Sequence, residues 1–136
     1  HKPDDIDGYT LAVYGPSGVS RVAEDLAKQL ANLRGIIEVD NQSVLRKLSG
    51  GRYGARGVAV LSREVGDYLI ARDQVPGVKP IGEVKKIDYA IGLSRQRFSA
   101  EQAAQFNAVI RHLARSGTTL ALAERYGMKA AVPAPK

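Results

Sequence analysis

The sequence of 136 residues predicts an α/β fold, in which a mostly parallel sheet is flanked by helices and followed by a C-terminal helix pair. Three observations support this fold class. Short apolar runs alternate with helical patterns through the first 72 residues, which favours parallel strands joined by right-handed crossovers. A glycine-rich turn follows the first apolar run. Near the C-terminal end, apolar residues recur at helical spacing.

The first predicted strand covers residues 9–14, because this run is short, apolar and partly β-branched. Small and polar residues at 15–20 form a turn, and we expect Ser20 to be the N-cap of the next helix. The apolar stripe of this helix consists of Val22, Leu26, Leu30 and Leu33. Gly35 is predicted to end the helix.

Two further strand–helix pairs are predicted downstream. A strand at 36–39 precedes a short helix, capped by Asp40 or Asn41, that carries Val44, Leu45 and Leu48. A third strand at 57–61 is followed by a helix over 63–71, with Ser62 as its N-cap. The repeated order of strand and helix predicts one continuous sheet.

The second half of the chain begins with two predicted strands. The first, at 78–81, is weak because Pro80 interrupts it, and the second covers 86–93. Ser99 and Gln102 have the spacing of a capping box and predict the start of a long helix. Its apolar stripe consists of Ala103, Phe106, Val109, Ile110 and Leu113. Gly117 is predicted to end this helix, and a last helix follows between Thr118 and Gly127.

Composition excludes several classes of function. The chain has no cysteine, which rules out disulfides, thiolate metal sites and thiol nucleophiles. No apolar run approaches the roughly 18 residues of a membrane span. The net charge of +6 permits nucleic-acid binding, but aromatic residues make up 6% and there is no run of Lys and Arg. We therefore expect no nucleic-acid partner. No metal-ligand spacing and no Ser/His/Asp arrangement is present, so we expect neither a metal site nor catalysis.

The turn after the first strand invites comparison with a phosphate-binding loop. That motif has a second glycine, a lysine and a hydroxyl residue in succession, and here the corresponding positions hold Ser20, Arg21 and Val22. Nucleotide hydrolysis is therefore rejected. The turn can still bind an anion through backbone N–H groups at the helix start. The alternative is that the turn only reverses the chain and caps the helix.

Other polar residues follow the remaining strands. Residues 40–42 and 62–64 are expected at the same edge as the first turn, where ligands of open α/β sheets bind. Arg52, Arg56 and Arg63 form either a basic cluster facing an anionic ligand or a solvated basic surface.

Several stretches, in this order, resemble one known family. They are Lys2-Pro-Asp-Asp-Ile-Asp-Gly8 before the first strand, Val44-Leu-Arg-Lys-Leu-Ser-Gly-Gly-Arg52, Asp88-Tyr-Ala-Ile-Gly-Leu-Ser-Arg95 and Leu122-Ala-Glu-Arg-Tyr-Gly127. Together they resemble bacterial extracellular solute-binding protein family 3, which is typified by periplasmic polar amino-acid-binding proteins. The resemblance covers the second lobe and the C-terminal helices of that family.

The resemblance implies an organisation and a function. Residues 1–8 are a linker, 9–94 the second, ligand-binding lobe of a clamshell, 95–128 the C-terminal helices and 129–136 a tail. The implied protein is an exported periplasmic component of an ABC transport system that closes on a small polar solute and delivers it to a membrane permease. It needs no cofactor. No counterpart of the first lobe is present, so the chain is expected to be a fragment or a reduced form.

The resemblance also implies ligand-binding residues, which are Ser17, Gly18, Val19, Arg21 and Ser62. The sequence departs from the family at three places: one loop threonine is replaced by Gly18, the Gly-Arg step at 51–52 lacks its aspartate, and Ser62 stands where an aspartate often holds an amino group. These departures disfavour an α-amino acid and favour an anionic or neutral solute, or no small ligand at all.

One alternative function remains open. The fold can serve as an interaction module that recognises a periplasmic protein, such as a dehydrogenase or a sensor, in place of a small solute. The C-terminal apolar stripe needs cover, so we expect these helices to fold back on the sheet or to pack against another chain, self-association included.

Overall fold

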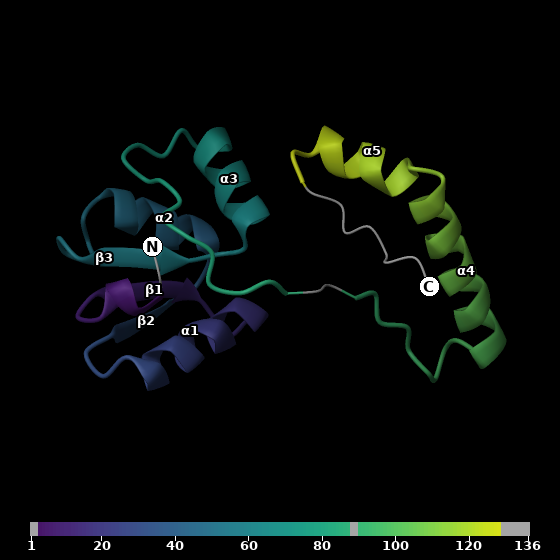
Figure 1. Cartoon of the computed structure of the whole chain (residues 1–136), viewed down its shortest axis with the longest axis horizontal. Coiled ribbons are helices and arrows are strands. Elements are labelled where there is room, and N and C mark those ends of the chain that lie inside the picture. Colours follow the sequence, from purple (N-terminus) through teal and green to yellow (C-terminus); the bar gives the residue numbers. More distant parts are fainter. Residues whose placement is uncertain (1–2, 88–89, 129–136) are drawn as a thin grey trace. The chain divides into compact units, whose positions relative to one another are not determined.

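The computed structural model describes residues 3–87 and 90–128. The chain divides into two units, His1–Lys86 and Ile87–Lys136 (Figure 1). The first unit contains a short 3-10 helix η1 (Pro3–Ile6), three strands and three helices. These are β1 (Thr10–Tyr14), α1 (Gly18–Gln29), β2 (Arg34–Glu38), α2 (Asn41–Ser49), β3 (Gly57–Val60) and α3 (Arg63–Arg72). The alternation of strand and helix is confirmed.

The three strands form one parallel sheet in the order β2-β1-β3. Thr10 of β1 is in register with Arg34 of β2 and with Gly57 of β3. The central strand is the most buried, since Leu11, Ala12 and Val13 are each less than 5% exposed. The unit is therefore α/β with a parallel sheet, as predicted.

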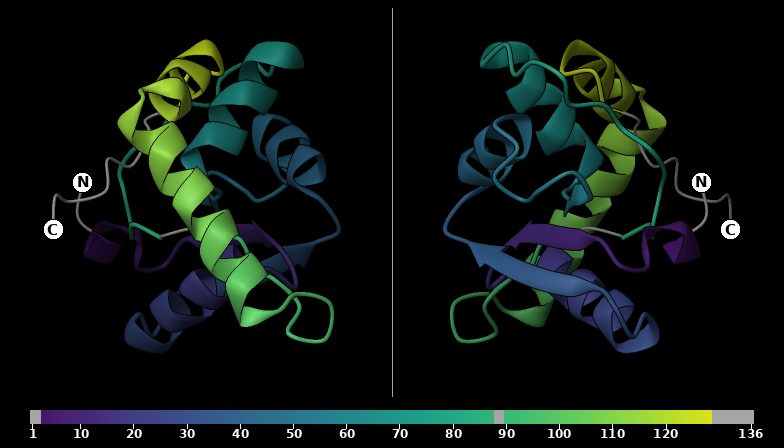
Figure 2. Two further views of the ribbon diagram at one scale, coloured as in Figure 1. Left: turned by 90° about the vertical axis from the view of Figure 1, so that its right-hand side faces the viewer. Right: turned by 90° about the vertical axis from the view of Figure 1, so that its left-hand side faces the viewer.

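Helices cover both faces of this sheet (Figure 2). On one face, Leu11 and Val13 pack against Ala23 and Leu26 of α1. On the other face, Ala12 packs with Val44 of α2 and with Tyr53. The two-residue period of β1 thus divides its side chains between two apolar layers.

The residues before β1 belong to the same packing. Ile6, at the end of η1, lies against the core on the α1 side of the sheet. The carboxylate of Asp7 accepts hydrogen bonds from the backbone N–H and the side-chain amide of Asn32, both at 3.0 Å. Residues 3–8, predicted to be a linker, are therefore tied to the sheet unit at two points.

The first helix begins earlier than predicted. Its N-cap is Ser17, which has an extended backbone and accepts a hydrogen bond from the N–H of Ser20. Assigning Ser20 as the cap was wrong, because Ser20 occupies the third helical position and completes a reciprocal capping box. The role assigned to Gly35 was also wrong. The helix ends at Gln29, and Gly35 lies within β2.

The caps of α2 and α3 differ from each other. Asp40 caps α2 by accepting a hydrogen bond from the N–H of Ser43 at 2.6 Å, which confirms one of the two predicted caps. Ser62 holds the N-cap position of α3, but its side chain makes no capping hydrogen bond. Its hydroxyl donates instead to the carboxylate of Glu64 at 2.9 Å.

The two strands predicted beyond residue 77 are absent from the described residues. Residues 78–81, 86–87 and 90–93 have no strand structure, and Asp88 and Tyr89 lie outside the described residues. The apolar pattern led to a wrong prediction here, because a strand is stabilised mainly by hydrogen bonds and side-chain packing with a neighbouring strand. Isoleucines 81, 87 and 91 are between 42% and 67% exposed.

The described part of the second unit contains helices α4 (Ala100–Arg115) and α5 (Thr118–Arg125), which contact each other. The predicted capping box at the start of α4 is confirmed, with hydrogen bonds in both directions between Ser99 and Gln102. Gly117 separates the two helices, and its backbone is in the left-handed region, with φ of +80°. Neither helix has a buried residue, and Val109 of the predicted stripe is 55% exposed. The predicted tail, 129–136, lies outside the described residues.

None of the helices in the described ranges 3–87 and 90–128 has the length and apolar character needed to cross a membrane.

Candidate functional site

The carboxyl ends of the three strands lie at one edge of the sheet, and a helix begins just after each of them. Between β1 and β3 the strand order reverses, because the chain passes from β1 to β2 on one side and then returns across β1 to β3. The helix after β1 covers one face, whereas the helix that leads to β3 covers the other. In open α/β sheets such a reversal opens a crevice in which ligands bind.

The turn after β1 is held by reciprocal hydrogen bonds. The hydroxyl of Ser17 donates to the carbonyl of Tyr14 at 2.7 Å and accepts from the N–H of Ser20 at 3.1 Å. The hydroxyl of Ser20 donates to the carbonyl of Ser17 at 2.8 Å and accepts from its N–H at 2.9 Å. Both hydroxyls therefore fix the turn, and the Ser17 hydroxyl has no proton left for a ligand.

The backbone supplies the donors at this point. Gly18 and Val19 are the first two residues of α1, so their N–H groups have no acceptor within the helix. A depression of about 320 Å³ lies beside them, lined by Pro16, Ser17, Gly18, Ser20, Arg21 and Glu24. Of these residues, Arg21 adds a positive charge and Glu24 a negative one. The arrangement can accept an anionic group through N–H donors and one guanidinium.

The structure brings together only part of the five predicted ligand residues. Three of them, Ser17, Gly18 and Arg21, line the depression. The side chain of Val19 packs against the core instead, which leaves only its backbone for a ligand. Ser62 follows the neighbouring strand β3 and does not line the depression.

A second feature of this edge was not found from the sequence. Glu38, the last residue of β2, is 8% exposed, and its carboxylate accepts hydrogen bonds from Lys47 Nζ at 2.6 Å and from Tyr53 Oη at 3.0 Å. The hydrogen bond from Lys47 holds the pKa of Glu38 below its ordinary value. Burial, reinforced by the same carboxylate, raises the pKa of Tyr53.

This network is joined to the turn through the backbone. The carbonyl of Glu38 accepts a hydrogen bond from the N–H of Gly15 at 3.2 Å. A Cβ atom at Gly15 would lie 3.0 Å from Ile37 Cγ2 and 3.2 Å from Ser20 Cβ. A larger residue at position 15 would therefore require Ile37 or Ser20 to shift slightly. The sequence offered one signal for this network. Glu38 lies two residues after Ile36, which is half-buried, so both side chains lie on the same face of β2.

The predicted arginine cluster does not form as one group. Arg52 and Arg56 precede β3, whereas Arg63 follows it, so the strand Gly57–Val60 separates them. Arg52 and Arg56 lie before the amino end of β3 and Arg63 lies after its carboxyl end. Only Arg63 therefore lies at the carboxyl edge of the sheet.

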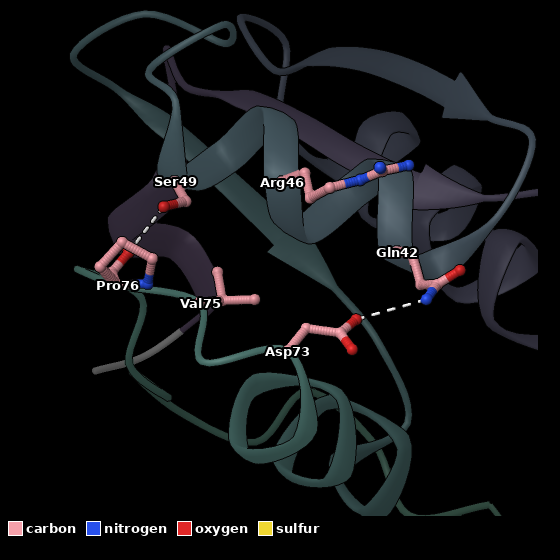
Figure 3. A pocket seen from close by; sticks show the side chains of 6 residues that line it. All are labelled: Gln42, Arg46, Ser49, Asp73, Val75 and Pro76. Atoms are coloured by element: carbon pink, nitrogen blue, oxygen red, sulfur yellow. Dashed lines mark hydrogen bonds between the residues drawn. The ribbon is translucent and has the colours of Figure 1, made fainter.

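A second depression, of about 350 Å³, lies between α2 and the turn after α3 (Figure 3). Its lining residues are Gln42, Arg46, Ser49, Asp73, Val75 and Pro76. Gln42, one of the polar residues predicted at the strand ends, donates here to the carboxylate of Asp73 at 3.3 Å.

Among the residues that the structure describes, no group of three His, Asp or Glu side chains could hold a metal ion. Comparisons with protein-family models, with curated proteins and with solved structures found no match to this chain.

Proposed function

We propose that the first unit, His1–Lys86, is a lobe that binds a small polar or anionic solute at the carboxyl edge of its sheet. In this proposal the chain is the second lobe of a two-lobe receptor that serves a periplasmic transport system and catalyses no reaction. One observation carries the proposal: the order β2-β1-β3 places the turn of Ser17 and Gly18 at the point where the strand order reverses.

The local chemistry favours an anionic group on the solute. Gly18, at the positive end of the α1 dipole, lines the same depression as Arg21. The carboxylate of Glu64, in the first turn of α3, accepts a hydrogen bond from the hydroxyl of Ser62. Position 62, where the family that the sequence resembles often has an aspartate that holds an amino group, is a serine in this chain.

The proposed mechanism is closure of the receptor's first lobe over the solute that this second lobe has bound. One open edge supplies only half of an enclosing site, and burying most of a ligand's surface requires a second wall. Hinge closure in two-lobe receptors brings such walls together and traps the ligand between them. The solute would then be released to a membrane permease.

A thermal-shift titration of the full chain tests the proposal. Acetate, inorganic phosphate, inorganic sulfate and a set of α-amino acids are added separately over a range up to millimolar concentrations. We expect at least one anion to raise the melting temperature, since a solute that binds only the folded state stabilises it. The variant Arg21→Gln should lose this increase.

The matched control is Arg34→Gln, which removes an exposed arginine at the opposite edge of the same sheet. It should bind like the parent chain. The proposal fails if no solute changes the melting temperature, or if Arg21→Gln and Arg34→Gln respond alike.

A second candidate function rests on a different observation. The two helices of the second unit leave apolar side chains exposed, among them Val109, Leu120 and Leu122 at 45% to 55%. Such surfaces are typical of protein contacts. This favours an interaction module with a protein partner, and co-purification of one defined protein, together with silence in the solute titration, would support it.

A further inference from the structure

We propose that the free side of β2, the side that faces away from β1, is a dimer interface at which a second copy of this chain adds its own β2 in the antiparallel direction. The two three-stranded sheets then join into one sheet around a two-fold axis. Such a contact uses the same surface on both copies, so it closes on itself and stops at a dimer. The proposal does not depend on the proposed solute-binding function, because no residue of β2 lines the depression beside α1.

The backbone of β2 pairs with a strand on one side only. In the order β2-β1-β3, its one strand neighbour among the described residues is β1 (Figure 1). The N–H of Arg34 donates to the carbonyl of Tyr9 at 3.0 Å, and the carbonyl of Glu38 accepts from an N–H of the turn after β1 at 3.2 Å. Alternate residues of β2 therefore direct their backbone groups to β1, and those of Gly35 and Ile37 point to the free side.

The side chains at this strand are unusually apolar for an edge. Ile37 is 65% exposed and Val39, just after the strand, is 79% exposed, more than any other large hydrophobic side chain described in the first unit. Edge strands are commonly protected by lysine or proline, and residues 34–39 contain neither. The strand at the other side of the sheet, β3, has four half-buried residues and no charged side chain that could set a register. These observations favour β2 as the strand that pairs.

One antiparallel register, centred on Ile36, is complementary to itself in shape. It places Gly35 of each copy opposite Ile37 of the other, and these two residues are the ones whose backbone groups point to the free side. A Cβ atom at Gly35 would meet nothing within 4 Å, so there is room above the glycine for the isoleucine of the second copy. The exposed Ile37 of each copy is covered in this way.

The charges agree with the same register. Arg34 is exposed and has no ion-pair partner in the part of the chain that the structure describes. In the dimer it lies opposite Glu38 of the second copy, at a Cβ separation of about 5 Å. Each oxygen of the Glu38 carboxylate already accepts one hydrogen bond, from Lys47 or from Tyr53, and a carboxylate oxygen can accept another. A shift of the register by two residues would separate Arg34 from Glu38.

Sedimentation velocity of the full chain, from micromolar to millimolar concentration, tests for the dimer. We expect a reversible equilibrium between monomer and dimer. Arg34→Glu should raise the dissociation constant at least about tenfold, because both symmetry-related pairs change from attraction to like-charge repulsion. Gly35→Lys should abolish the dimer, because it places a lysine where Ile37 of the second copy would lie.

Arg52→Glu is the matched control, because it makes the same change of charge at an exposed arginine that lies outside β2. It should leave the dissociation constant unchanged, and urea midpoints verify that all three variants fold. The proposal is overturned if the parent chain stays monomeric at millimolar concentration. It is also overturned if a dimer persists unchanged in Arg34→Glu and Gly35→Lys, which would place the contact elsewhere, such as on α4 and α5.

Cysteine cross-linking tests the register, because the chain has no cysteine of its own. Ile36→Cys places two thiols opposite each other at the two-fold axis, within the Cα separation of about 4.4–6.8 Å that a disulfide spans. Mild oxidation should therefore link this variant into a dimer. Val39→Cys is the control, since its side chain is more exposed but the register holds the two copies of position 39 about 20 Å apart. Linking of Val39→Cys as fast as Ile36→Cys, or faster, would contradict the proposed pairing.

Discussion

The two units of this chain use the same local devices but differ in what the rest of the structure adds to them. Both α1 and α4 begin with a reciprocal capping box, at Ser17–Ser20 and at Ser99–Gln102. In the first unit the helix behind the box buries Ala23 and Leu26 on a sheet, whereas neither helix of the second unit buries any residue.

The comparison teaches that capping and amphipathic spacing specify a helix without specifying its partner. A helix in water gains most of its stability from packing of its apolar face. We therefore expect substitutions in the first unit to change the cooperative unfolding of the chain, and equivalent substitutions in the second unit to have local effects only.

The largest effect is expected from truncating a core leucine. Leu11, on the central strand, is 1% exposed, so Leu11→Ala should lower the free energy of unfolding by about 2–5 kcal/mol. Leu122→Ala is the matched change in the second unit, at a side chain that is 50% exposed, and should cost less than about 0.5 kcal/mol. Urea denaturation followed by circular dichroism measures both. Equal losses would remove the distinction between the units.

A smaller effect is expected at the turn after β1. Gly15→Ala places a Cβ atom 3.0 Å from Ile37 Cγ2 and 3.2 Å from Ser20 Cβ, so we expect a destabilisation of about 1–3 kcal/mol. Gly18→Ala is the control, because a Cβ at that position meets nothing within 4 Å. The control should be neutral or slightly stabilising. A neutral Gly15→Ala in urea denaturation would show that the turn adjusts freely.

The two capping boxes provide a direct comparison of the units. Ser17→Ala should lower the free energy of unfolding of the sheet unit by about 1 kcal/mol, the usual loss for an N-cap. Ser99→Ala should reduce the protection of the α4 amides in hydrogen exchange but leave the urea transition of the sheet unit unchanged. A lower urea midpoint in Ser99→Ala would mean that the units unfold together.

The smallest effect is a pH dependence that originates at Glu38. Because the bond from Lys47 lowers the folded-state pKa of Glu38, the ion pair stabilises the fold above pH about 4.5, the ordinary value, and this contribution is lost as the pH falls through the lower folded-state value. Glu38→Gln should therefore be less stable than the parent at pH 7, with the two urea midpoints converging toward pH 3.

Asp67→Asn is the control for this comparison, because Asp67 pairs with Arg63 at 3.7 Å while both side chains are more than half exposed. Such exposed pairs contribute little, so its midpoint should follow the parent at every pH. A constant difference between Glu38→Gln and the parent from pH 7 to pH 3 would contradict an electrostatic origin.

The local elements of the first unit could be predicted from the order of residues alone. The apolar runs placed all three strands to within two residues, and short-range side chains determined the helix starts, as with Asp40 before α2. The cap was assigned to Ser20 in place of Ser17, an error of three positions within one capping box. These features depend on neighbours three or four residues apart, which a sequence displays directly.

Features in which residues distant in the sequence meet became visible only in the folded chain. The strand order β2-β1-β3, the burial of Glu38 with Lys47 and Tyr53, and the depression beside Arg46 each join segments separated by turns or whole elements. Residues 86–87 and 90–93 give the opposite example. Their apolar pattern predicted a strand, but they pair with no neighbouring strand and form none in the described part of the chain. Pairing and burial are non-local, so their energies cannot be assigned before the chain is folded.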